Sequence, residues 1–221
     1  MQLVVTTKGD CSKALRKVSF LGFDSVEKNG LYCKNKFKGV FVFMKFGVRK
    51  MCTMAILASL SLVLLLILHF PIFPAAPWLE YDPADIPILI GGFVYGPVAG
   101  IIITVIASLV QALTVSASAG LVGFVMHVIA TGTLVTVSSL FYKSHKTHKG
   151  AFIALILGCL SMAAIMIPTN LIISVNFWGM SLEAVKGMMI PILIPFNLIK
   201  SGANAVIVFL IYKSLRGIIK E

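Results

Sequence analysis

The sequence has few charged residues, and acidic ones are especially scarce. Asp and Glu together number eight in 221 residues, and all charged residues make up 12% of the chain. Hydrophobic residues make up 58%, and the mean hydropathy is +0.99. So little polar surface cannot cover a water-soluble globule of this size. These proportions exclude a soluble protein and predict that most of the chain lies in lipid.

Catalytic and metal-binding motifs are also missing from the sequence. It contains no G-x-S-x-G, no H-E-x-x-H, no phosphate-binding G-x-x-x-x-G-K-[ST] and no pair of carboxylates within an apolar stretch. We therefore expect no catalytic residues and no ATP hydrolysis by this chain alone, so that any pumping needs partner subunits. Four cysteines show no C-x-x-C and no metal-ligand spacing, which predicts neither a disulfide nor a zinc site: Cys11, Cys33, Cys52 and Cys159.

Long apolar stretches predict an all-α integral membrane protein with six transmembrane helices. A hydrocarbon core of roughly 30 Å requires about 20 apolar residues per helix. Gly96, Pro97 and the small polar run 116–120 divide the longest stretch, because such residues are typical of turns. The second helix is short for a full span. The helices are expected at 51–70, 84–95, 97–114, 120–142, 150–175 and 188–213.

Basic residues cluster at one side of the six expected spans. They precede the first helix, fill the loop after the fourth and follow the last. The opposite, outer side has Lys186 as its only basic residue and receives Glu80, Asp82, Asp85 and Glu183. The positive-inside rule therefore places both termini in the cytoplasm. Because the basic residues flank spans, the net charge of +11 indicates topology, and nucleic-acid binding is the weaker interpretation. The chain is thus expected to be a multi-pass protein of the cell membrane.

Residues 1–43 differ from the remainder, residues 44–221, which form the expected membrane domain. The first segment is basic, has no long apolar run and has neither the apolar region nor the cleavage site of a signal peptide. A disordered cytoplasmic tail, a small basic domain and a start codon placed too early are three interpretations. The run from Met44 has the composition of an ordinary membrane-protein start, which favours the third.

Several polar side chains lie within the expected spans, where lipid makes them costly. Lys200 is near the middle of the last helix, with Asn197 and Asn204 on the same face, and Asn170 lies in the outer third of the fifth helix. A central Lys costs roughly 2.5 to 3.5 kcal/mol on translocon scales. A single Asn in a membrane helix more often forms a hydrogen bond to a neighbouring helix than it binds a ligand. Because no acidic residue lies inside a span to neutralise Lys200, the set favours a ligand pocket in the outward half of the bundle.

Two histidines and two aromatic residues each allow alternative interpretations. One interpretation of His69 and His127 is a haem held between helices, and the other, more common for lone intramembrane histidines, is hydrogen bonding within the bundle. Trp78 and Tyr81 lie in a proline-rich outer loop, where they would either stack on a flat solute or belong to the interfacial aromatic belt.

Three runs of sequence resemble one family. PWLEYDPADIPILIGGFVYGPVAG from Pro77, PTNLIISVNFWG from Pro168 and PFNLIKSGANAVIVFLIY from Pro195 are similar to riboflavin-specific substrate-binding subunits of energy-coupling factor (ECF) transporters. The likeness extends from about Met44 to the C-terminus. It implies a six-helix fold in the bacterial plasma membrane that binds riboflavin from outside, with no other cofactor. It also implies partners, namely a transmembrane coupling protein and two ABC ATPase subunits.

The resemblance also implies roles for particular residues. Asn170, Asn197 and Lys200 match the polar residues that contact the flavin, and the segment 78–82, with Trp78, Leu79 and Tyr81, matches the gating loop. The family docks its coupling protein on an A-x-x-x-A stripe of the first helix. Here the stripe is Ala55 and Ser59, small enough for close helix approach.

Ligand chemistry leaves rival functions open. The pyrimidine-like edge of riboflavin alternates acceptors with a donor, which Asn amides match in both senses, and Lys adds donors. Lys disfavours a cation such as thiamine but would pair with the carboxylate of biotin, so a subunit for biotin is the nearest alternative. A stand-alone secondary transporter would need an intramembrane carboxylate or an ion cage, and no carboxylate is evident within a span.

Overall fold

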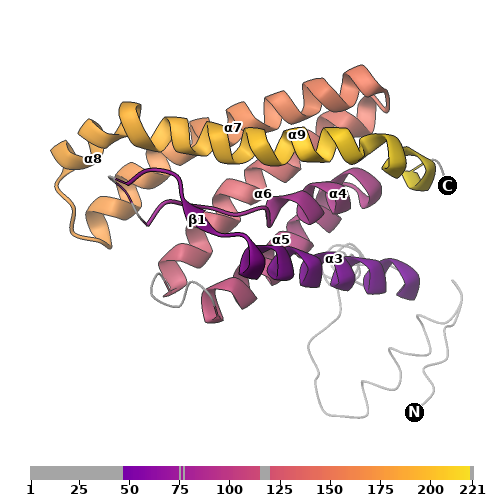
Figure 1. The fold of residues 1–221 in the computed structure, drawn as a ribbon, viewed down its shortest axis with the longest axis horizontal. Coiled ribbons are helices and arrows are strands. Elements are labelled where there is room, and N and C mark those ends of the chain that lie inside the picture. Colours follow the sequence, from indigo (N-terminus) through magenta and orange to yellow (C-terminus); the bar gives the residue numbers. More distant parts are fainter. Residues whose placement is uncertain (1–46, 75, 77, 115–119, 220–221) are drawn as a thin grey trace, which may run out of the picture. The chain divides into compact units, whose positions relative to one another are not determined.

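The computed structural model describes residues 47–74, 76, 78–114 and 120–219, with side chains up to 211. The basic segment 1–43 and most of the turn expected at 116–120 lie outside these ranges. Within them, a bundle of helices carries one small β-ribbon (Figure 1). The elements are α3 (Val48–Ile67), β1 (Phe70–Pro71), β2 (Glu80–Tyr81), α4 (Asp85–Tyr95), α5 (Pro97–Leu113), α6 (Gly120–Ser144), α7 (His148–Asn176), α8 (Leu182–Met188), the π-helical turn η3 (Met189–Leu193) and α9 (Ile194–Ile219).

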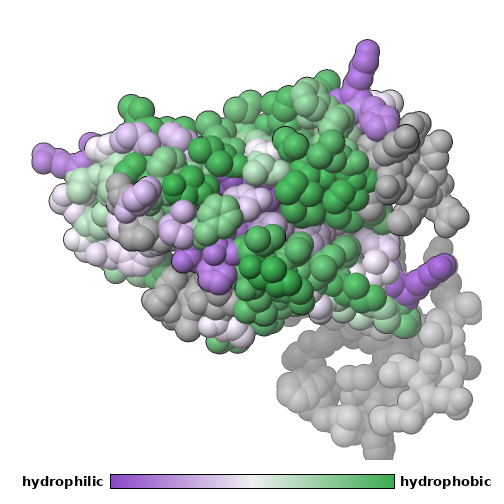
Figure 2. Space-filling view, viewed as in Figure 1, coloured by the Kyte–Doolittle hydropathy of each residue, from purple (hydrophilic) through white to green (hydrophobic). Residues whose placement is uncertain are grey.

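Four helical segments of the described chain are long and apolar enough to cross a membrane. They are Val48–Ile67, Gly120–Ser144, His148–Asn176 and the continuous segment Leu182–Ile211, whereas α4 and α5 are shorter apolar helices. Apolar side chains dominate the surface over α3 and the middle of α9 in Figure 2. Exposed apolar side chains on several faces are expected where lipid is the solvent. The chain is therefore a mostly helical membrane protein.

The helices pack around α4 and α6. Helix α6 contacts α4, α5 and α7, while α9 contacts α4 and α7, and α3 contacts α4 and α5. Gly96 allows the sharp connection between α4 and α5, because its φ of 89° lies in the left-handed region that favours glycine. Pro97 then starts α5, where a missing N–H costs no helical hydrogen bond.

Prolines shape the two helices that carry the predicted binding residues. Pro168 lies inside α7, two residues before Asn170. The last expected helix is divided differently from the prediction of 188–213, because α8 and η3 precede α9. Pro191 lies within η3 and Pro195 in the first turn of α9, and neither supplies an N–H to the helical ladder. Both predicted Asn positions are thus close to a locally altered backbone.

The connection between α3 and α4 is a folded ribbon. Strands β1 and β2 pair antiparallel, with Phe70 opposite Tyr81 and Pro71 opposite Glu80. The Tyr81 ring lies 5.4 Å from the Phe70 ring, measured between centroids. The ribbon brings residues 78–82 against α9. All of them except Tyr81 also form part of the wall of the cavity described below.

Candidate functional site

A cavity of about 200 Å³ lies among the α3–α4 connection and helices α5 to α9. Its wall combines many apolar side chains with a few polar ones, the usual composition of a site for a small organic molecule. Five of the six binding residues predicted from the sequence line it: Trp78, Leu79, Asn170, Asn197 and Lys200. The connection between α5 and α6, residues 115–119, lies outside the described chain.

The amides of Asn170 and Asn197 are held by their own helices. Asn170 Nδ2 donates to Met166 O and Asn197 Nδ2 donates to Leu193 O, each over 2.7 Å. Both side chains are buried. Among the described contacts, neither amide bonds to a second helix, so neither residue is the interhelical link that a lone membrane Asn often provides. Each keeps its Oδ1 and one N–H for a molecule in the cavity.

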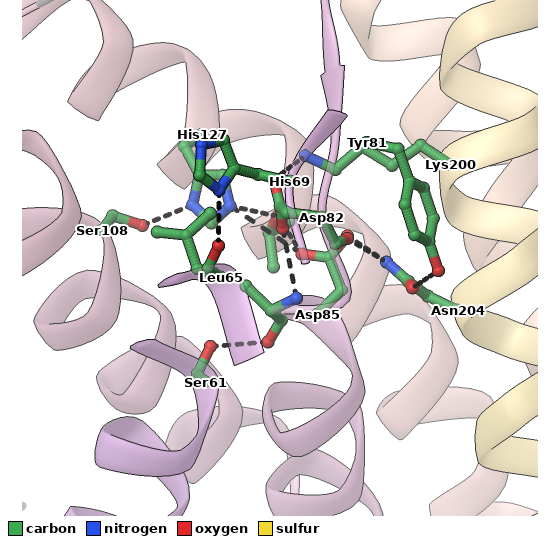
Figure 3. A network of polar contacts seen from close by, with 12 residues as sticks. Ser61, Leu65, His69, Tyr81, Asp82, Asp85, Ser108, His127, Lys200 and Asn204 are labelled. Carbon is green, nitrogen blue, oxygen red and sulfur yellow. Dashed lines mark hydrogen bonds and ion pairs between the residues drawn. The ribbon is translucent and has the colours of Figure 1, made fainter. Parts of the chain in front are cut away.

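Lys200 is paired with a carboxylate, contrary to the expectation that nothing would neutralise it. Its Nζ donates to Asp82 Oδ2 over 2.7 Å, and both residues are buried (Figure 3). The prediction was wrong because Asp82 belongs to the α3–α4 connection, which was read as an outer loop, yet this residue reaches α9 inside the bundle. One of the three Lys200 donors is thereby used, and two remain for a ligand.

Asp82 remains ionised through this pairing. Burial alone would raise the pKa of Asp82, but the Lys200 ammonium and the hydrogen bond from Ala84 N hold it below its ordinary value. A charged, hydrogen-bonded pair fixes the Lys200 side chain in one position, so its donors are already oriented toward the cavity before a ligand arrives.

Asn204 connects the α3–α4 connection to α9, although it does not line the cavity. Its Nδ2 lies 3.1 Å from Asp82 O and 3.2 Å from Asp85 Oδ2, and its Oδ1 accepts from the Tyr81 hydroxyl over 2.9 Å (Figure 3). Burial and the neighbouring carboxylates raise the pKa of Tyr81, which keeps the donated proton in place. Tyr81, the sixth predicted binding residue, therefore contacts α9 and is not among the cavity-lining residues.

We expect Asn204→Leu to destabilise the protein strongly. The substitution leaves Asp85 without one partner and the Tyr81 hydroxyl without its acceptor, and an unsatisfied buried polar group costs about 1 to 3 kcal/mol. Thermal unfolding of the purified protein in detergent measures the effect. Asn176→Leu is the matched control, because the exposed Asn176 amide bonds only to Ile172 O of its own helix. Equal melting temperatures for the two variants would contradict the linking role of Asn204.

A second group of polar side chains extends from the cavity to the start of α4. Ser108 Oγ lies 2.7 Å from His127 Nδ1, and Thr131 Oγ1 donates to Asp85 Oδ1 over 2.7 Å. His127 Nε2 lies 3.9 Å from that same carboxylate oxygen. Sequence reasoning had placed Asp85 on the outer side, yet the residue is fully buried in the first turn of α4. The burial of Asp85 could not be inferred from the sequence, because it depends on the α3–α4 connection entering the bundle.

The two residues of the predicted docking stripe, Ala55 and Ser59, are exposed on the outer face of α3. They lie one helical turn apart, and Ser59 Oγ donates to Ala55 O.

The two histidines form hydrogen bonds within the bundle, as lone intramembrane histidines usually do. His69 Nδ1 contacts Leu65 O, and His127 Nδ1 contacts Ser108 Oγ. Cys52 and Cys159 are free thiols, and Cys11 and Cys33 lie outside the described residues.

Fold and cavity together define a membrane protein that binds a small molecule between its helices. Comparison with known proteins gives the family: residues 49–212 match the family described as "ECF transporter, substrate-specific component". The chain belongs to this family of transport subunits, which are not enzymes.

Relatives and a solved structure agree with that assignment. The chain is 32% identical to the riboflavin transporter FmnP of Bacillus subtilis, over 79% of this chain and 95% of the relative. It is 29% identical to the riboflavin transporter RibU of Streptococcus thermophilus, over 80% and 87% respectively. The structure of the S component of a bacterial ECF transporter superposes with a TM-score of 0.67 at 28% identity, covering 78% of this chain and 98% of that one.

Proposed function

We propose that this chain is the riboflavin-binding subunit of an ECF-type importer in the cell membrane. The observation that carries the proposal is that Asn170, Asn197 and Lys200 line one cavity and keep acceptors and donors that no other described residue uses. Such a set matches the alternating carbonyls and N–H at the edge of the flavin ring. Two relatives that are 29 and 32% identical, and of which this chain covers 87 and 95%, are named riboflavin transporters, which supports the same ligand here.

The Lys200–Asp82 pair argues against biotin as the ligand. A biotin carboxylate would need an unpaired cation, whereas the Lys200 charge is already balanced by Asp82 at 2.7 Å. An added anion would therefore compete with Asp82 and leave one negative charge buried without a partner. Riboflavin is uncharged and takes hydrogen bonds from Lys200 without disturbing the pair.

A stand-alone secondary transporter stays the weaker proposal, although the argument made against it from the sequence, the lack of an intramembrane carboxylate, no longer holds. Asp82 and Asp85 are buried carboxylates, so the expected lack of such groups was wrong. Both, however, are held by hydrogen bonds to neighbouring residues, and the family consists of subunits that provide substrate specificity to a larger transporter. We propose that a transmembrane coupling protein and two ABC ATPases complete the importer.

We also propose that the membrane domain, residues 44–221, crosses the membrane six times with both termini in the cytoplasm, and that 1–43 is a dispensable extension. Four segments have the length to span, and α4 with α5 would supply the other two. Figure 1 places the start of α3, the α6–α7 connection and the end of α9 at one end of the bundle. Lys50, Lys143 and Lys149 belong to this end, in agreement with the positive-inside rule.

The proposal predicts that protein purified from its membrane is yellow. We expect bound flavin in the visible absorption spectrum and nanomole-for-nanomole release of riboflavin on denaturation. Asn197→Leu should lower riboflavin affinity by about 5- to 150-fold, because the flavin edge loses a buried hydrogen-bond partner. Its melting temperature should stay close to wild type, since the Asn197 amide bonds only within α9 and η3.

Two results would contradict the proposal. Wild-type protein that neither carries flavin nor quenches added flavin fluorescence would exclude riboflavin as the ligand. An Asn197→Leu protein with wild-type affinity but a lowered melting temperature would show that this amide stabilises the bundle and does not contact the ligand. Asn176→Leu again serves as the control for replacing an amide on the outer surface.

A further inference from the structure

A second hollow lies on the surface of the bundle, between the beginning of α7 and the C-terminal part of α9. It has a volume of about 400 Å³ and shares no lining residue with the cavity described above. The α6–α7 connection and the end of α9 lie at the same end of the bundle (Figure 1). We call this hollow the α7–α9 groove, and the residues that line it are His148, Lys149, Phe152, Ile153 and Phe209.

The floor of the groove is apolar and partly open to the surroundings. The Phe209 ring of α9 packs on α7 with its centroid 5.5 Å from that of Phe152 and 6.2 Å from that of His148, in both cases edge to face. Phe152 and Ile153 nevertheless remain 51% and 44% exposed. Exposed apolar side chains that gather in a hollow at the end of membrane helices are suited to contact with hydrocarbon.

The rim of the groove is basic. Lys149 belongs to the groove, and Lys143 and Lys146 lie in the turns just before it, all three exposed. Within the described chain, none of these three side chains has an ion pair or a hydrogen bond. The sequence contains no Asp or Glu from residue 86 to residue 182, so α6 and α7 supply no counter-ion of their own. The rim therefore attracts an anion.

One kind of molecule uses both parts of the groove. A free phosphate ion would contact the lysine but leave the apolar floor uncovered, and a neutral lipid would cover the floor but leave the lysine without an anion. A molecule that carries an anionic group directly beside hydrocarbon satisfies both. Anionic phospholipids have this chemistry, and basic pockets between membrane helices bind their headgroups.

We propose that the α7–α9 groove binds an anionic phospholipid, with the headgroup phosphate at the Lys149 ammonium and the start of an acyl chain against Phe152 and Ile153. A Lys side chain suits this position, because its aliphatic stem lies along apolar surface while its ammonium reaches the headgroups. With the orientation proposed above, the lipid comes from the cytoplasmic leaflet. The site does not depend on riboflavin as the transported ligand.

The lipid site does not overlap the predicted docking stripe. Ala55 and Ser59 are exposed on α3, which packs against α4 and α5, whereas the groove belongs to α7 and α9. A coupling protein docked on α3 therefore leaves the groove open to lipid. A bound lipid would hold the ends of α7 and α9 at the membrane surface, and these are the helices that carry Asn170 and Asn197.

Native mass spectrometry of the purified full-length protein tests the site. Phosphatidylglycerol and phosphatidylcholine with identical acyl chains are added to the protein in a nonionic detergent. We expect wild-type protein to retain phosphatidylglycerol in preference. Lys149→Met should weaken that binding by about 5-fold and leave phosphatidylcholine unchanged. Lys143→Met is the matched control, because Lys143 is exposed in the last turn of α6 and does not line the groove.

A bulky side chain in the groove tests the apolar part. Ile153→Trp should fill the space of the acyl chain and abolish the preferential retention of phosphatidylglycerol. Leu160→Trp is the control, since Leu160 is exposed on the same helix two turns further along and does not line the groove. Both positions are exposed, so a melting curve and flavin binding close to wild type are expected for each variant.

The outcomes distinguish a lipid site from its alternatives. Equal losses in Lys149→Met and Lys143→Met would show diffuse attraction to basic residues, and unchanged retention in Ile153→Trp would show that the groove holds no chain. Either result overturns the proposal, as would equal retention of the two lipids by wild-type protein. Competition by glycerol 3-phosphate as strong as that by phosphatidylglycerol would indicate a free-anion site and also overturn it. Preferential lipid retention by protein that binds no flavin would leave the proposal standing while the proposed riboflavin function fails.

Discussion

Replacing Lys200 with Met is expected to abolish measurable riboflavin binding and to lower the melting temperature. The ligand loses a charged donor, and Asp82 is left as a buried carboxylate without its cation. Removing one member of a buried ion pair typically costs 3 to 5 kcal/mol. The sequence predicts only the loss of a ligand contact, and the ion pair adds a loss of stability to it. Thermal unfolding and flavin titration together measure the two effects.

The double variant Lys200→Met with Asp82→Asn separates stability from binding. Because both charges are removed, no buried ion remains unpaired, and we expect the melting temperature to recover most of the loss. Riboflavin affinity should stay low, since the Lys200 donors are still absent. Lys186→Met, at an exposed position of α8, controls for the loss of a positive charge. A double variant with wild-type affinity would show that the pair serves stability alone.

Replacing Ser59 with Trp is expected to stop uptake while leaving riboflavin binding unchanged. Ser59 and Ala55 form a small-residue stripe on the exposed face of α3, away from the residues that line the cavity. Small residues let a partner helix approach closely, and a bulky indole prevents that approach. Uptake in a riboflavin-requiring host and flavin titration of the purified protein provide the two readouts.

A bulky residue elsewhere on the lipid-facing surface controls for general damage. Leu160→Trp enlarges an exposed apolar side chain of α7, and we expect normal uptake from that variant at equal abundance in the membrane. Normal uptake with both Ala55→Trp and Ser59→Trp would exclude this face of α3 as the coupling surface. Loss of binding in either would instead mean that the substitution had disturbed the bundle.

The lengths of the apolar stretches and the breaker residues predicted the positions of most helices. Expected helix bounds of 97–114 and 150–175 compare with Pro97–Leu113 and His148–Asn176 in the structure. Such agreement is possible because helix formation depends on neighbouring residues and on the length needed to cross lipid. The division of 188–213 into α8, η3 and α9 was missed, since a proline near a helix start does not reveal how the backbone rearranges around it.

The candidate site was only partly predictable. Asn197 and Asn204 are indistinguishable in sequence, being Asn residues on one face of one helix, yet Asn197 lines the cavity and Asn204 holds the α3–α4 connection. The two differ because Asn204 contacts Asp82, a residue of the α3–α4 connection. Asp82 also pairs with Lys200, from which it lies 118 residues away along the chain. No local pattern encodes a contact over that distance. The free-energy cost of a polar side chain in lipid identified the residues that need partners. Which residues are those partners could be learned only from the three-dimensional structure.

The Lys200–Asp82 pair also has an electrical consequence. An isolated ammonium that moves through a membrane potential does work of about 2.3 kcal/mol per 100 mV for each elementary charge that crosses the full field. The pair carries a positive and a negative charge 2.7 Å apart, so their sum is zero. Any displacement of α9 together with the α3–α4 connection therefore moves no net charge at this position. With an uncharged vitamin bound between the helices, the voltage across the membrane neither drives nor opposes that movement through these two residues.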